Sequence, residues 1–146
     1  MQYSNLANMQ VLAGSTRPAP TDIQGRVRMA SFNLTVGAAD TSGILVKMPS
    51  GTVRILKADL KATLATGATT LAIGTSAYND LNNASVAAAP AGLQAAVVST
   101  SLSGLAAVPA EGVVISSIKG FDVTVTSSAN MAVNDVIRGT LYYVVD

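Results

Sequence analysis

Residues 121–126 read Phe-Asp-Val-Thr-Val-Thr, the cleanest alternation of apolar and polar side chains in this chain of 146 residues. A repeat of two residues is the pattern of a β-strand that is buried on one face and exposed on the other. The stretch therefore predicts a strand whose Phe121, Val123 and Val125 side chains point into a core. The Ser, Ala and Asn residues at 127–130 predict a turn directly after it.

The same alternation recurs toward both ends of the chain. Residues 30–36 place four apolar side chains on one face, and residues 136–145 repeat the pattern with Ile137, Leu141, Tyr143 and Val145. The opposite face of that last strand carries Arg138, Thr140 and Tyr142. Shorter strands are expected at residues 44–48, 69–74 and 113–118, with a loop at residues 37–43.

Residues 52–66 fit two patterns. Alternation of apolar with polar residues suits a strand, whereas a leucine at every fourth position suits a helix, as with Leu56, Leu60 and Leu64. We expect a strand, because the surrounding segments are strands. Val53 and Ile55 have the opposite parity to these leucines, so the strand needs a β-bulge to bury both sets.

Residues 81–110 contain no charged side chain. The stretch is long enough to cross a bilayer, but two prolines, two glycines and several Ser and Asn residues interrupt it. We expect buried or contact-forming loops and strands there instead of a membrane helix. Residues 78–83 predict turns, with a short helix that could start near Asp80, and residues 84–91 predict either one helical turn or an irregular loop.

Six to nine short strands separated by Gly, Ser, Asn and Pro turns predict an all-β fold, either a β-sandwich or a jelly roll. The length favours one domain. Residues 1–25 hold Pro18 and Pro20 and little apolar sequence, which favours an extended N-terminal arm. The expected organisation is an arm at residues 1–25 and a sandwich or jelly-roll body at residues 26–146.

The chain contains no histidine, cysteine or tryptophan, and only 12% of its residues are charged. These absences exclude Ser-His-Asp and cysteine catalysis and remove the commonest soft metal ligands. The eight acidic residues are spread along the chain and form no calcium-binding pattern. We therefore expect a protein that is not an enzyme, with no catalytic residue, cofactor or metal site.

Charge is unevenly distributed along the chain. Residues 1–61 carry seven of the nine Lys and Arg residues but only three acids, whereas residues 62–146 carry two bases and five acids. This asymmetry suits complementary contacts between copies or with a neighbour, but scattered solvated charge is the simpler interpretation. The net charge of +1 does not favour nucleic-acid binding.

Three segments resemble small structural proteins of tailed bacteriophage particles, in particular the head decoration, or cement, proteins. A Pro-small-Gly turn at residues 49–51 leads into a strand, and Thr-Leu-Ala-Ile-Gly follows at residues 70–74. The chain ends in a Gly-x-Leu-x-Tyr-Val strand that begins at Gly139. The resemblance implies a sandwich or jelly-roll body that assembles into trimers, binds the major capsid protein on the capsid exterior and bridges its subunits.

The resemblance also gives the uncharged and proline-containing segments expected roles as contacts. We expect capsid contacts from the arm and the start of the body, at Arg17, Pro18, Pro20 and Arg26. We expect homo-oligomer contacts from the uncharged stretch, at Leu93, Val97, Val98, Leu102, Leu105 and Val108. Neither nucleic acid nor membrane is an expected partner. The alternative is a head-fibre or tail-associated protein that recognises a host glycan, although the chain has only six aromatic residues to build such a site.

Overall fold

The computed structural model of the protein describes residues 26–65 and 69–145, and most of these residues lie in β-strands. Sheet A contains, in spatial order, β1 (Arg28–Thr35), β10 (Val136–Val145), β3 (Gly51–Thr63) and β8 (Val113–Ser117). Sheet B contains β2 (Asp40–Met48), β9 (Phe121–Met131), β4 (Thr70–Thr75) and β7 (Ala89–Val98). A small hairpin pairs β5 (Tyr78–Asn79) with β6 (Ser85–Val86), and a 3₁₀ turn, η1 (Ser99–Ser101), follows β7.

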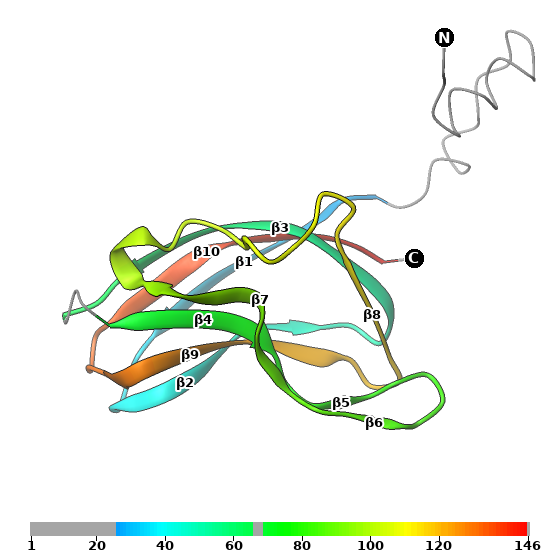
Figure 1. The fold of residues 1–146 in the computed structure, drawn as a ribbon, viewed down its shortest axis with the longest axis horizontal. Helices are drawn as coiled ribbons and strands as arrows, with labels where there is room; N and C mark the ends of the chain where they lie inside the picture. The colour runs from blue at the N-terminus through cyan, green and yellow to red at the C-terminus, as the bar shows by residue number, and fades with distance from the viewer. Residues whose placement is uncertain (1–25, 66–68, 146) are drawn as a thin grey trace, which may run out of the picture.

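All neighbouring strands are antiparallel, and the two sheets form two layers (Figure 1). Apart from the step between β4 and β7, each connection between main strands carries the chain from one sheet to the other. Eight strands with the orders β1-β10-β3-β8 and β2-β9-β4-β7 form a jelly roll. The predicted all-β class is confirmed, and the topology selects the jelly roll from the two architectures expected.

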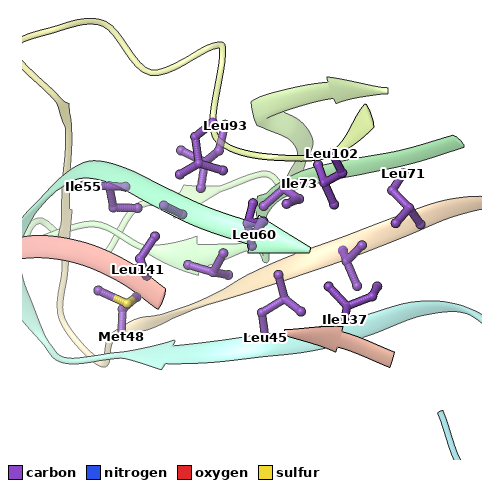
Figure 2. Close-up of a cluster of buried hydrophobic side chains, with 14 of the residues drawn as sticks. Leu45, Met48, Ile55, Leu60, Leu71, Ile73, Leu93, Leu102, Ile137 and Leu141 are labelled. Carbon is purple, nitrogen blue, oxygen red and sulfur yellow. The ribbon is translucent and has the colours of Figure 1, made fainter. Parts of the chain in front are cut away.

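The core lies between the two sheets. Figure 2 shows leucine, isoleucine and methionine side chains from both sheets meeting in one cluster, which includes Leu45, Ile55, Ile73 and Leu141. The predicted inward residues of β9 are all buried, as are Ile137 and Leu141 of β10. Among the residues described, no helix is long and apolar enough to span a membrane.

Residues 52–63 form a strand, and the predicted bulge is present. Lys57 lies opposite Tyr142 and Ile55 lies opposite Tyr143, so Leu56 is an extra residue in β3. The insertion reverses the parity of the strand at this point. Val53 and Ile55 before it and Ala58 and Leu60 after it can therefore all be buried.

One predicted loop is shorter than expected and one predicted turn is absent, because strand pairing extends into both segments. β2 begins at Asp40, within the loop predicted at residues 37–43, because Asp40 pairs with Met131. The turn predicted at residues 127–130 is wrong, since β9 continues through Met131. Its Ser127 pairs with Leu71 of β4, and the Ser127 hydroxyl donates to the Ala129 carbonyl at 2.6 Å. Pairing with two neighbouring strands thus overrides the local turn preference.

The turn predicted around Asp80 is present, but no helix starts there, and the helical or irregular segment predicted at residues 84–91 is wrong. The chain forms the β5–β6 hairpin there, and β7 begins at Ala89. The Asp80 carboxylate accepts the backbone N–H groups of Asn82 at 2.8 Å and Ala84 at 2.9 Å, which stabilises a turn in place of a helix. The arm predicted at residues 1–25 lies outside the described residues, so its boundary with the body stays a prediction.

Candidate interaction surfaces

One edge of sheet A is only partly covered by a neighbouring strand. β8 pairs with β3 over residues 51–55, whereas β3 continues to Thr63. Residues 99–112 lead from β7 back to sheet A, and we call them the crossing segment. Beyond the end of β8, part of this segment lies along β3. The Leu60 N–H donates to the Ser103 carbonyl at 3.1 Å, which fixes this crossing segment to the strand edge.

Gln94 of β7 holds the crossing segment from the other sheet. Its side chain is 5% exposed. The amide oxygen accepts the Ala106 N–H at 2.6 Å, and the amide nitrogen donates to the Ala95 carbonyl at 2.9 Å. A third bond joins the Ala107 N–H to the Leu93 carbonyl at 3.1 Å. The crossing segment is therefore a built part of the fold, with polar contacts to both sheets.

A groove of about 450 Å³ opens between β3 and the crossing segment. We call it the edge groove; its lining residues are Lys57, Ala58, Asp59, Gln94, Val97, Ser101, Leu102, Ser103, Gly104, Leu105 and Ala106. A Cβ atom on Gly104 would lie 3.3 Å from the Ala58 carbonyl oxygen, so the segment approaches the backbone of β3 closely. The groove combines strand-edge backbone with small and apolar side chains.

The structure brings three of the residues predicted for oligomer contact, Val97, Leu102 and Leu105, to the edge groove. Leu102 and Leu105 are largely buried in the chain's own core, as is Leu93. Val98 is 42% exposed, and Val108 is half-buried against the core. Val97 and Val98 thus offer most of the predicted surface, and the contact itself stays a prediction.

Replacing Gln94 by leucine should destabilise the body by about 1 to 3 kcal/mol, because the Ala106 N–H loses the buried Gln94 amide oxygen as its acceptor while the side-chain volume changes little. Urea unfolding followed by circular dichroism measures the change. Gln94→Glu retains an acceptor for Ala106 and adds a buried charge. A Gln94→Leu variant as stable as the natural chain would show that the crossing segment does not depend on this hydrogen bond.

A second surface is formed by the outer face of sheet A. Strand alternation places Lys57 and Lys61 of β3 and Arg138 of β10 on the face that points away from the core, with Asp59 and Tyr142 beside them. We call this the basic face. The Lys57 ammonium lies 3.6 Å from the Asp59 carboxylate and 4.6 Å from the centre of the Tyr142 ring. Tyr142 is therefore engaged by a cation of its own chain.

The basic face was not predicted from the sequence. The alternation of residues 136–145 already places Arg138, Thr140 and Tyr142 on one face. The excess of basic residues before residue 62 supplies the second signal. The sequence does not show the register of β3 against β10. Lys61 and Arg138 are far apart in the chain and become neighbours only when these two strands pair.

The remaining predicted site residues lie at or before the start of the body. Arg26 is exposed at the first described position, and Arg17, Pro18 and Pro20 fall outside the described residues. Across residues 26–65 and 69–145, no three acidic side chains gather into a group that could hold a metal ion.

A chain of a solved phage capsid has a similar arrangement of strands. A chain from the capsid of Ralstonia phage GP4 aligns with a TM-score of 0.53 over 88% of this chain and 90% of that chain, at 22% sequence identity. The fold is similar to that of a phage capsid chain. A chain of the cyanophage Pam1 capsid asymmetric unit aligns with a TM-score of 0.45 over 84% and 86% of the two chains, at 20% identity. No protein-family model and no curated protein matches the sequence.

Proposed function

We propose that this chain is a structural virion protein that binds the outer surface of a phage capsid and stabilises the shell by bridging its subunits. The observation that carries the proposal is the jelly-roll likeness to a chain of the Ralstonia phage GP4 capsid, which extends over nearly the full length of both chains. The decoration role is supported by the sequence resemblance of the strands after Ser50, Thr69 and Asp135 to cement proteins.

Binding to capsids tests the proposal directly. Capsids of the phage that encodes this chain, prepared without it, are mixed with the purified protein and sedimented. We expect saturable binding and a higher temperature of DNA release from the decorated particles. Absence of the protein from the sedimented capsids would contradict the proposed function.

The arm at residues 1–25 is the proposed capsid-contacting element, together with Arg26. Removing residues 1–25 should abolish sedimentation with capsids while the thermal unfolding of the body is retained. Charge reversal in the full chain, with Arg17→Glu and Arg26→Glu together, gives a second variant that leaves the chain length unchanged. Capsid occupancy equal to that of the natural chain in both variants would contradict a role for the arm.

Homo-oligomerisation, as a trimer, is the second proposed element. Val98 is an exposed apolar residue at the end of the uncharged β7 and follows Val97, which lines the edge groove. Permanent interfaces are depleted in charge and rich in apolar side chains, which suits this segment. Light scattering at micromolar concentration should give three times the mass of the chain, and Val98→Lys should lower it. A stable monomer would contradict the trimer.

A further inference from the structure

We propose that the basic face of sheet A is a docking surface for an acidic protein surface. The inference rests on the proposed function, which makes the capsid shell the bearer of that acidic surface, and it adds the orientation in which the body meets the shell. It concerns Lys61 and Arg138 above all, since both are exposed and neither forms an ion pair with another described residue.

Lys61 and Arg138 lie directly opposite each other in the β3–β10 register. Both side chains are exposed, and within the described residues neither forms an ion pair. Like charges at directly opposed positions of two antiparallel strands destabilise the pairing. Their next neighbour across the sheet is Asn33 of β1, which is uncharged. Asp59, the acid on this face, is paired with Lys57. Lys61 and Arg138 therefore form an unfavourable pair of cations that an external anionic group would relieve.

The two sheets differ in the sign of their charge. The strands of sheet A carry five cationic residues and one acid, namely Arg28, Arg54, Lys57, Lys61, Arg138 and Asp59. The strands of sheet B carry one cation, Lys47, and two acids, Asp40 and Asp122. Although the net charge of the chain is close to zero, sheet A is therefore basic. A basic surface of this kind steers and orients a partner of opposite charge.

A protein partner fits this face better than a nucleic acid does. Tyr142, the aromatic ring of the basic face, already contacts the Lys57 ammonium and is not free to stack on a base. Met29 lies opposite Tyr142 and is 69% exposed, so an apolar side chain stands beside the cations. Methionine, tyrosine and arginine are enriched at protein–protein interfaces, and Met29, Tyr142 and Arg138 bring all three to this face.

Single charge reversals separate docking from folding. Lys61→Glu or Arg138→Glu converts the repulsive pair into an attractive one, so the midpoint of thermal unfolding should stay the same or rise. We expect each variant to bind undecorated capsids at least tenfold more weakly than the natural chain at 150 mM salt. Lys119→Glu is the matched control, because it makes the same charge change at an exposed position between β8 and β9. We expect its affinity to stay within twofold of the natural value.

Each outcome decides between the claims. If the natural chain binds capsids and the Lys61→Glu and Arg138→Glu variants bind equally well, the basic face is not the docking surface, but the proposed function is retained. If the natural chain does not bind capsids, both the docking surface and the proposed function are contradicted. A 30-base-pair DNA duplex is the second probe, and tight binding that both reversals abolish would replace the protein partner by nucleic acid. The inference is supported if the Lys61→Glu and Arg138→Glu variants lose capsid binding and the Lys119→Glu variant retains it.

Discussion

Gly74→Ala should destabilise the body by about 3 kcal/mol or more, which is at the upper end of the effect of overpacking a core. A Cβ atom on Gly74 would overlap the Ala89 carbonyl oxygen and lie 2.5 Å from the Pro90 carbonyl carbon. Both atoms belong to the backbone of β7, which cannot rotate away as a side chain can. β7 would have to separate from β4, its neighbour in sheet B.

Urea unfolding followed by circular dichroism measures this effect, and Gly37→Ala is its matched control. A Cβ atom on Gly37 meets nothing within 4 Å. Its backbone is not in the left-handed region, so alanine there should be neutral or stabilise by about 0.4 to 1 kcal/mol. Equal unfolding midpoints for the two variants would contradict the close approach of β7 to β4.

Asp135→Ala should destabilise the body by about 2 to 5 kcal/mol, because two backbone N–H groups lose their acceptor in a buried site. The Asp135 side chain is 3% exposed and accepts the Ala65 N–H at 2.8 Å and the Ala132 N–H at 2.7 Å. Its backbone carbonyl accepts the Val36 N–H at 2.9 Å. One residue thus joins the ends of β1, β3 and β9 at one end of the sandwich.

Thermal and urea unfolding of three variants separate the causes of this loss. Asp135→Asn keeps one acceptor oxygen and the volume, so we expect it to fall between the natural chain and Asp135→Ala. Asp59→Ala is the control, because its carboxylate is 63% exposed and its ion pair with Lys57 contributes at most about 1 kcal/mol. A loss in Asp135→Ala no larger than in Asp59→Ala would show that the carboxylate does not hold these connections.

Most of the strands that were predicted correctly have one buried and one exposed face, whereas β4 was also predicted correctly although it is buried along almost its whole length. β9 and β10 alternate from their first residues, and β3 does so on each side of Leu56. β7 does not alternate, because Pro90 and Gly92 lie in an irregular stretch where its register with β4 shifts. Local sequence does not reveal a strand whose regularity is interrupted in this way, and residues 84–91 therefore looked like a helical turn or an irregular loop.

The candidate surfaces were less predictable than the fold. The absence of charge in residues 93–108 does not distinguish a residue of the chain's own core from one in contact with another copy, so Leu93 and Val98 fell into one group. The structure separates them, since Leu93 is buried and Val98 is exposed. The basic face depends on the pairing of β3 with β10, and the register of this pairing cannot be inferred from the local sequence pattern of either strand.

A cryo-electron microscopy reconstruction of the phage capsid tests the central claim most directly. We expect jelly-roll density on the outside of the shell, in contact with more than one capsid subunit, with the outer face of sheet A turned toward acidic side chains of the shell. Density for this chain inside the shell, in the tail, or nowhere on the mature particle would contradict the claim that it is a capsid-stabilising structural protein.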